Sequence, residues 1–507
     1  MLAGVVCTLS CLLLVSSAVA EDEDDYEHQV LHVQILSDAS IDSINQRYGT
    51  TTIDSLPPLY LLDLPEGWSE DTLEELLEDD PDIVEAELAW EGETPESSRQ
   101  MVVSAVGGTI EDFLDQGIAA RLRLADAHRH VQGDGVLVAV IDTGVSADHP
   151  ALAGVVAPGG YDFVDDDPDP TDEADGVDND GDGQVDEGAG HGTMIAGIVR
   201  LVAPNARILP IRVLDDEGLG RTFNVAKGIR HAVEQGAQII NLSLGLRHHA
   251  MVLRHEILRA EDRAVMMTSA AGNDGVENPQ FFPASENQVL SIAALDSCDV
   301  KAEFSNWHQE VEISAPGVGV RAPYHDGEYA IGAGTSFSTA FVSGQCALIL
   351  SLHPGLPPED IRETVRLGVL EIDDIPGNEE YAGRLGTGRL DAYETWLHAP
   401  KAASVEAWPP AETGSEWKAF PNPSVSGEPI RFRRAGEAGR APGGAWILDV
   451  RGRKVARLAT GGGEPGLLVW NGRDRAGRPV SAGVYFLRLE GDARNRPDAS
   501  PLLLLDR

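Results

Sequence analysis

The chain is predicted to contain a central α/β domain with a doubly wound, mostly parallel sheet. We expect a ferredoxin-like α+β domain before it and a small all-β sandwich after it. Three observations lead to this organisation. Apolar strands alternate with helical segments from about residue 112 to 397. Residues 27–90 follow a β-α-β-β-α-β order. After residue 398 the segments are short, apolar and interrupted by Gly and Pro, without a helical period.

The first 20 residues form a predicted signal peptide. An apolar segment ends in Ala18-Val19-Ala20, a small-residue cleavage signal, and acidic residues follow at once. The segment before the apolar stretch has no Lys or Arg, so an uncleaved anchor and a start other than Met1 stay open as alternatives. Cleavage would leave no integral membrane span, because no other run approaches the roughly 18 apolar residues that a span needs.

Residues 27–90 alternate between strand and helix patterns. The helix starts have Ser or Asp as capping residues, and acidic residues occupy the first turn of the second helix, where the helix dipole favours them. The expected order is strand, helix, two strands, helix, strand, at residues 28–36, 40–49, 51–56, 59–65, 69–81 and 83–90. Residues 91–111 are polar and predict a linker.

The domain at 112–397 is predicted from five buried strands and the helices between them. Residues 136–141, VLVAVI, form a continuous apolar run, as expected for a strand that is covered on both faces. Further strands are expected at 207–213, 237–244, 264–270 and 288–295, with helices at 222–236 and 251–263.

The C-terminal part divides into a Pro- and Ala-rich linker at 398–416 and a β-sandwich at 417–507. The sandwich is rich in Arg and is the least acidic part of the chain.

Composition restricts the partners. The 507 residues include 38 Lys and Arg against 83 Asp and Glu, for a net charge of −45. Nucleic acid and anionic membranes attract positive charge, so neither is an expected main partner. Cys298 and Cys346 remain after signal cleavage, and we expect both to be unpaired, partly buried thiols.

Three motifs contain candidate catalytic side chains. VIDTGV ends a buried strand on Asp142, HGTMIAGIV begins a helix at His191, and GTSFSTAFVSG places Ser336 at the entry of a long apolar helix. Active sites of open α/β sheets lie at the carboxyl ends of the strands. Taken singly, each residue has a local structural interpretation: a turn aspartate, a polar helix start and an N-cap serine.

Together, the three motifs in the chain order Asp, His, Ser resemble the subtilases, the subtilisin-type serine peptidases, over roughly residues 120–397. Sedolisin-type peptidases, which share the fold, have Glu in place of this histidine. The family usually has Met and Pro where this chain has Phe337 and Ala340. Both positions concern packing or helix entry, so the predicted activity is retained.

The resemblance implies a role for each residue. Ser336 would be the nucleophile, His191 the general base and acid, and Asp142 the group that orients the imidazole. Asn273 of TSAAGNDG matches the asparagine of the family's oxyanion hole, and its local alternative is a turn residue. Ser243, Leu244 and Gly245 match the strand that pairs with the backbone of a protein or peptide substrate.

The resemblance extends to both flanks. Residues 27–90 resemble the inhibitor-type propeptide of the family, which implies an intramolecular inhibitor and a zymogen cut between Glu91 and Arg129; a permanent accessory domain is the alternative. Residues 417–490 resemble the FlgD-type Ig-like domain, also found as a secretion-sorting domain. That unit would be a sorting signal, a contact to secretion machinery or the cell surface, or a spacer.

An acidic run precedes His191. Residues 165–187 contain ten Asp and two Glu and no Lys or Arg. Alternating carboxylates followed by Gly183 begin an EF-hand-like loop, so we expect a structural calcium ion. The expected ligands are Asp178, Asp180, Asp182, Gln184 and Asp186, with Glu187 as a substitute because position twelve is Ala189. Residues 165–175 are expected to be a flexible acidic insertion, which is also the alternative for the whole run.

The sequence therefore predicts a secreted or cell-surface serine endopeptidase with an acyl-enzyme mechanism, a structural calcium ion and no organic cofactor. Two alternatives stay open: a catalytically silent binding or adhesion protein on a subtilase scaffold, and a protein whose main function is carried by the C-terminal unit. Substrate preference is not encoded in a recognisable motif.

Overall fold

The chain divides into two units, residues 1–401 and 402–507. In the first unit the computed structural model describes residues 26–69, 74, 77, 79–94, 105–179, 181, 183–278 and 281–399. In the second it describes eight strands and parts of residues 471–480. The predicted signal peptide lies outside the described residues.

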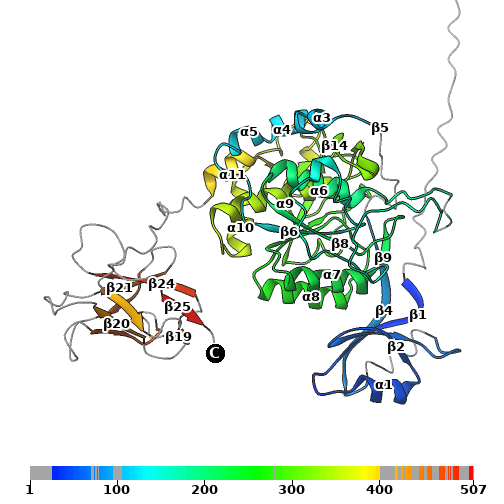
Figure 1. Cartoon of the computed structure of the whole chain (residues 1–507), viewed down its shortest axis with the longest axis horizontal. Coiled ribbons are helices and arrows are strands. Elements are labelled where there is room, and N and C mark those ends of the chain that lie inside the picture. The colour runs from blue at the N-terminus through cyan, green and yellow to red at the C-terminus, as the bar shows by residue number, and fades with distance from the viewer. Residues whose placement is uncertain are drawn as a thin grey trace, which may run out of the picture. The chain divides into compact units, whose positions relative to one another are not determined.

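A nine-stranded sheet forms the centre of the first unit (Figure 1), in the order β16-β17-β13-β12-β11-β10-β6-β8-β7. Its pairs are parallel except for β16 with β17, which agrees with the α/β fold expected from the sequence. The strands are β6 (Leu137–Asp142), β7 (Tyr161–Asp162), β8 (Arg207–Arg212), β10 (Ile239–Leu242), β11 (Met266–Ala270), β12 (Val289–Leu295), β13 (Val311–Pro316), β16 (Val369–Leu370) and β17 (Arg389–Leu390).

Helices cover both faces of this sheet. Figure 1 shows α6 (His191–Val202) and α9 (Thr335–Leu352) on one side and α7 (Thr222–Glu234) and α8 (Met251–Asp262) on the other. Along β6, Val138 and Val140 pack in the core with α6 and α9, whereas Ala139 and Ile141 pack in the core with α7 and α8. Because successive strand residues face opposite sides, burial on both faces explains the unbroken apolar run.

Helix α9 lies in the centre of the larger core. Thr335 to Leu350 are all buried, and the helix contacts α6 and the neighbouring strands β10 to β13. Among the described residues it is the one helix long and apolar enough to cross a membrane, and 89% of that stretch is buried inside the protein.

Shorter elements complete this domain. The α-helices are α3 (Ile110–Leu114), α4 (Gly117–Arg121), α5 (Leu124–Ala127), α10 (Pro358–Leu367) and α11 (Ala392–His398). The 3-10 helices are η2 (Pro150–Leu152), η3 (His325–Gly327) and η4 (Glu379–Tyr381). The remaining strands are β5 (Ala105–Val106), β9 (Leu219–Arg221), β14 (Val320–Pro323) and β15 (Tyr329–Gly332).

The N-terminal subdomain, residues 26–94, has a sheet in the order β2-β3-β1-β4, and all its pairs are antiparallel. Its elements are β1 (Tyr26–Ile35), α1 (Ile41–Tyr48), β2 (Thr51–Leu56), β3 (Leu59–Asp63) and β4 (Ile83–Glu93). The helix predicted at 69–81 falls mostly outside the described residues. Strand β4 does not end at residue 90 as predicted: it continues to Glu93, into the expected linker, where it pairs with β9.

The subdomain packs on α7 and α8 through charged and aromatic contacts. The Glu87 carboxylate accepts the backbone N–H of Met251, at the start of α8, with both oxygens at 2.8 Å. Lys227 of α7 pairs with Asp54 at 2.7 Å. The ring of His32 lies 5.8 Å from that of Phe223. A carboxylate at a helix N-terminus is favoured by the helix dipole, which helps to fix the subdomain on this face.

The described elements of the second unit are all strands, in a three-stranded sheet β18-β20-β23 and a five-stranded sheet β19-β25-β24-β21-β22. Trp446 is surrounded by cationic groups of Lys454, Arg457 and Arg475, 4.5 to 5.9 Å from its ring centroid. The strands are β18 (Trp417–Phe420), β19 (Ser424–Val425), β20 (Ile430–Arg434), β21 (Ala445–Asp449), β22 (Lys454–Leu458), β23 (Leu467–Trp470), β24 (Gly483–Leu489) and β25 (Leu502–Leu505).

Cys298 and Cys346 form no disulfide within the part of the chain that the structure describes. Cys298 is exposed rather than partly buried, whereas Cys346 lies inside α9 and is fully buried. Burial raises the pKa of the Cys346 thiol to about 12, which disfavours the reactive thiolate.

The crossing of α6 and α9 depends on a glycine. A Cβ atom added at Gly344 would lie 2.6 Å from Cβ of Val202, closer than real Cβ contacts. We expect Gly344→Ala to lower the free energy of unfolding by about 1–3 kcal/mol, because overpacking forces the helices apart. Gly117→Ala is the matched control, since its Cβ would meet nothing within 4 Å. Denaturant unfolding of both variants measures this, and equal stabilities would contradict the packing argument.

Candidate active site

Asp142 is held at the carboxyl end of β6, between β8 and β10. Its side chain is fully buried. The carboxylate oxygen Oδ1 accepts the backbone N–H of Thr143 at 2.9 Å and lies 2.6 Å from Nδ1 of His191. These contacts fix the carboxylate in one orientation, directed at the imidazole.

His191 is the first residue of α6 and is also fully buried. The helix begins immediately after Gly190, which has a φ of 88°. The next residue, Gly192, donates its N–H to the Thr143 hydroxyl at 3.0 Å. A Cβ atom at Gly192 would lie 2.0 Å from the carbonyl oxygen of Gly144, so a larger residue would push the helix start away from Asp142.

A second buried carboxylate anchors the same helix start. Asp172, 4% exposed, accepts the N–H of Gly190 at 2.9 Å and both the N–H and the hydroxyl of Thr193, at 3.2 and 2.7 Å. Burial raises the pKa of Asp172 to about 6, against the effect of these hydrogen bonds. Sequence reasoning missed this residue, because nothing distinguishes it from its neighbours in the acidic run.

The expectation of a flexible insertion at 165–175 is therefore wrong for several of its residues. Asp172 is buried, and Asp165 forms an ion pair with Arg212 at 2.7 Å. Arg212 also pairs at 2.7 Å with Asp162, the last residue of β7. The run contains structural carboxylates that only their distant partners reveal.

Ser336 lies in the first turn of α9, where its backbone N–H is one of the four that have no partner within the helix. Its Oγ donates to the carbonyl of Ser243 at 3.3 Å, and the Ser243 hydroxyl donates back to the Ser336 carbonyl at 3.2 Å. The ring of the next residue, Phe337, is edge-on to the His191 imidazole at 6.2 Å. The packing of Phe337 thus brings the start of α9 beside the histidine.

Asn273 follows β11 and is 5% exposed. Its amide oxygen accepts both the N–H and the hydroxyl of Thr335, at 3.0 and 2.9 Å. With the oxygen fixed in this way, the amide NH₂ is the group that can donate to a ligand beside Ser336.

Ser243, Leu244 and Gly245 directly follow β10 and are buried. Gly245 and Glu93 exchange both backbone hydrogen bonds, at 2.9 and 3.1 Å. The opposite edge of the end of β4 pairs with β9. Just beyond this pairing, the Thr94 N–H donates to the Gly218 carbonyl at 3.0 Å. The chain therefore contributes its own segment, residues 91–94, as a strand between two backbone edges next to Ser336.

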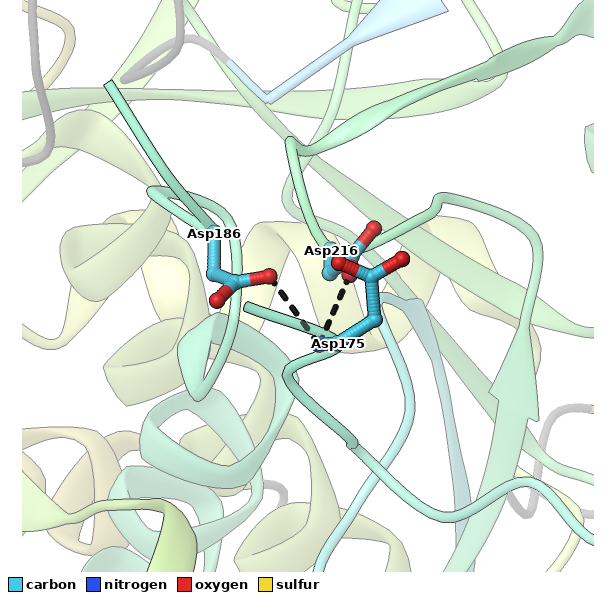
Figure 2. Close-up of side chains that lie close together, drawn as sticks. All are labelled: Asp175, Asp186 and Asp216. Carbon is cyan, nitrogen blue, oxygen red and sulfur yellow. Dashed lines mark hydrogen bonds between the residues drawn. The ribbon is translucent and has the colours of Figure 1, made fainter. Parts of the chain in front are cut away.

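Two carboxylates of the loop before His191, Asp175 and Asp186, lie close to Asp216 from the segment after β8 (Figure 2). Oxygens of Asp175, Asp186 and Asp216 lie within 4.8 Å of one another. The Asp175 N–H donates to Asp186 at 3.0 Å and to Asp216 at 3.1 Å. Burial raises the pKa of Asp216 and the Asp186 side chain raises it further, whereas the hydrogen bond from the Asp175 N–H opposes the shift. One oxygen of Glu217, the residue after Asp216, is buried and has no hydrogen-bond partner among the described residues: Oε2.

Of the predicted calcium ligands that the structure describes, only Asp186 belongs to this group. Asp178 instead accepts the N–H groups of Gly181 and Gly183, at 2.7 and 3.1 Å, and Gln184 lies 3.4 Å from Glu187. Asp180 and Asp182 lie outside the described residues. Asp175 and Asp216 were not predicted as ligands. Asp175 precedes the predicted calcium loop, and Asp216 comes from the segment after β8.

The comparisons with known proteins match the same region. The model of the Subtilase family, Peptidase_S8, covers residues 133–372. Thermitase of Thermoactinomyces vulgaris is 35% identical over 273 residues, which span 52% of this chain and 89% of that protein.

The chain belongs to the subtilase family. A second relative, the thermophilic serine proteinase of a Bacillus species, is 37% identical over 269 residues, covering 51% of this chain and 61% of that protein. Among solved structures, a protease of Pseudoalteromonas arctica is 28% identical with a TM-score of 0.50, covering 55% of this chain and 94% of that one. This subtilase is thus a serine-type peptidase that acts on proteins or peptides.

The Asp172 contacts predict a specific effect on this subtilase. We expect Asp172→Asn to lower the free energy of unfolding by about 1–3 kcal/mol at pH 7, because an amide cannot accept all the donors that surround the carboxylate. The pKa of Asp172 is higher in the folded protein than in the unfolded chain. Protonation of Asp172 therefore adds stability as the pH falls from about 6 towards the pKa of an aspartate in the unfolded chain. Asp172→Asn should lose that increment. Asp169→Asn, an exposed carboxylate of the same run, is the control. Identical pH–stability curves for wild type and Asp172→Asn would contradict the assignment.

Proposed function

We propose that this subtilase is a secreted serine endopeptidase that uses Asp142, His191 and Ser336 as its catalytic triad. The observation that carries the proposal is the buried 2.6 Å contact between Nδ1 of His191 and the Asp142 carboxylate. It leaves Nε2, on the other side of the imidazole, as the nitrogen that can take a proton. The Phe337 contact supports Ser336 as the proton donor, since it holds the start of α9 against this ring.

In the proposed mechanism His191 removes the proton of the Ser336 hydroxyl as Oγ attacks the scissile carbonyl. The resulting imidazolium is stabilised by Asp142, which also holds the tautomer with its proton on Nδ1. His191 then protonates the leaving amine, and the acyl-enzyme is hydrolysed by water through the same steps. The amide of Asn273 and the backbone N–H of Ser336 would donate to the tetrahedral oxyanion; such a donor contributes about 10²–10³ in kcat.

Substrates would bind as an added strand. Gly245 and β9 offer backbone donors and acceptors from two sides, and residues 91–94 already use them. Main-chain pairing of this kind gives affinity without fixing the side chains. Ser243, Leu244 and Gly245 form one wall of that groove and bring the peptide backbone to Ser336.

We further propose that the N-terminal subdomain is a propeptide and that the chain is a self-processing zymogen. Glu93 lies opposite Gly245. Ser243 precedes Gly245 by two residues, and its carbonyl accepts a hydrogen bond from Oγ of Ser336. An antiparallel register advances one residue for each residue of its partner, so the bond to be cut would lie shortly after Thr94. We place it within the five residues that follow Thr94.

Two parts of the proposal rest on the sequence patterns. Secretion is inferred from the signal-peptide pattern of residues 1–20. The role of the second unit as a sorting, secretion-machinery or surface domain is inferred from its resemblance to FlgD-type domains.

Calcium is proposed as a structural ion of the acidic loop. The donor set fits, because hard carboxylate oxygens suit Ca²⁺ and ligands at 2.3–2.6 Å from one ion lie within roughly 5 Å of one another. Asp175, Asp186 and Asp216 would hold it, with the unpartnered oxygen of Glu217 nearby. Bound calcium would offset the repulsion among these groups and order the loop that leads into His191.

The triad and the processing step are tested by Ser336→Ala. We expect this variant to stay at full length where wild type shortens, with the new N-terminus of the wild-type protein between Thr94 and Gln100. A fluorophosphonate probe should label the processed wild type and not the variant. Equal shortening of both proteins would exclude self-processing, and an unlabelled processed wild type would favour a catalytically silent scaffold.

Calcium binding is tested by chelation. We expect EGTA to lower the melting temperature of the processed enzyme by several degrees and to speed autolysis, because loss of one bound ligand removes a few kcal/mol of stability. Asp216→Asn should reproduce the loss and make the enzyme insensitive to EGTA. Unchanged melting and autolysis in EGTA would remove the ion from the proposal, with the triad unaffected.

A further inference from the structure

Strand β4 continues past the N-terminal subdomain into the proposed substrate groove. Glu91, Gly92 and Glu93 lie opposite Arg221, Gly220 and Leu219 of β9, and Glu93 also pairs with Gly245. Under the proposed function, the five residues 90–94 therefore occupy positions that a substrate strand takes. Their side-chain contacts show what the groove offers to a substrate upstream of the cleaved bond.

Trp90 is bound at both its backbone and its ring. The hydroxyl of Thr222, a fully buried residue that begins α7, donates to the Trp90 carbonyl at 2.6 Å. The imidazole of His248 stacks on the indole with centroids 4.0 Å apart and planes at 13°. Thr222, the residue after β9, thus adds one more hydrogen bond to the backbone of β4, and the His248 ring provides an aromatic surface for the side chain at this position.

Glu91 faces a cation. It is directly opposite Arg221 in the antiparallel register, and both residues are exposed. Directly opposed side chains in such a pair have Cβ atoms about 5 Å apart, close enough for opposite charges to stabilise each other. The chain as a whole carries a net charge of −45, which would repel an acidic peptide. Arg221 would offset this repulsion locally by attracting an acidic side chain at this one position.

We propose that Arg221, Thr222 and His248 form a recognition subsite for an aromatic residue followed by an acidic one. The aromatic residue would lie three positions, and the acidic residue two positions, upstream of the substrate residue that pairs with Gly245. Trp90 and Glu91 occupy this subsite in the uncleaved chain. The inference rests on the proposed function and adds a substrate class to it: extended peptides with an aromatic–acidic pair ahead of the cleaved bond.

The test uses the processed full-length enzyme and p-nitroanilide peptides of the form Xaa-Yaa-Gly-Ala-Ala-Phe. The first two positions are Trp-Glu, Ala-Glu, Trp-Ala or Ala-Ala, and a short peptide, Ala-Ala-Phe, lacks them. We expect Trp to raise kcat/KM about three- to tenfold and Glu to raise it about two- to fivefold. Both gains should come from a lower KM at constant kcat, because the contacts lie away from the reacting atoms.

Variants assign each gain to its residue. His248→Ala should abolish the advantage of Trp and keep that of Glu, and Arg221→Ala should do the reverse. The advantage of Glu should also shrink in high salt, which screens an exposed ion pair. Arg263→Ala, which removes an exposed arginine at the far end of α8, is the control and should keep both advantages.

Equal kcat/KM for the four long peptides would overturn the subsite and show that Trp90 and Glu91 serve only to dock the N-terminal subdomain. A uniform loss for all peptides in either variant would also overturn it, by indicating a structural role. Failure of the proposed function looks different: the short peptide would then not be cleaved by any form of the enzyme.

Discussion

The buried contact between Asp142 and His191 is the constraint on which the rest of the site depends. The two residues are 49 positions apart in the chain, and the acidic run 165–187 lies between them. Neither partner is exposed, so the helix start cannot move without leaving a buried polar group unpaired, which is costly. Two features hold it in place. The missing side chain at Gly192 lets the helix approach the turn after β6, and the Asp172 carboxylate binds the first turn of α6.

The sequence predicted the strands and helices whose apolar patterns come from burial against the central sheet. The apolar runs at β6, β8, β10, β11 and β12 and the helical spacing of α7 and α8 arise from burial against the two faces of one sheet, and they are visible in the sequence. Asp172 was not predictable, because its burial depends on donors from Gly190 and Thr193. The acidic group in Figure 2 shows the same limit, since Asp216 reaches it from the segment after β8.

Of the two backbone edges that flank residues 91–94, only the one after β10 has a signal in the sequence. The residues after β10 carry a motif, whereas β9 is only Leu-Gly-Arg and has no strand pattern of its own. It is a strand because β4 lies next to it and takes its hydrogen bonds. A short edge strand of this type gains its conformation from the partner, which suits a surface that accepts many different peptide backbones.

Strand β4 belongs to two structures at once, the N-terminal sheet and, through its pairing with β9, the proposed substrate groove. While the chain is intact, the occupant of the groove is tethered, and its effective concentration is set by the tether and not by the amount of protein. The proposed cut shortly after Thr94 would remove that tether without removing any of the contacts of β4. The same segment would then compete as a separate molecule, so dilution alone would shift the enzyme from occupied to open.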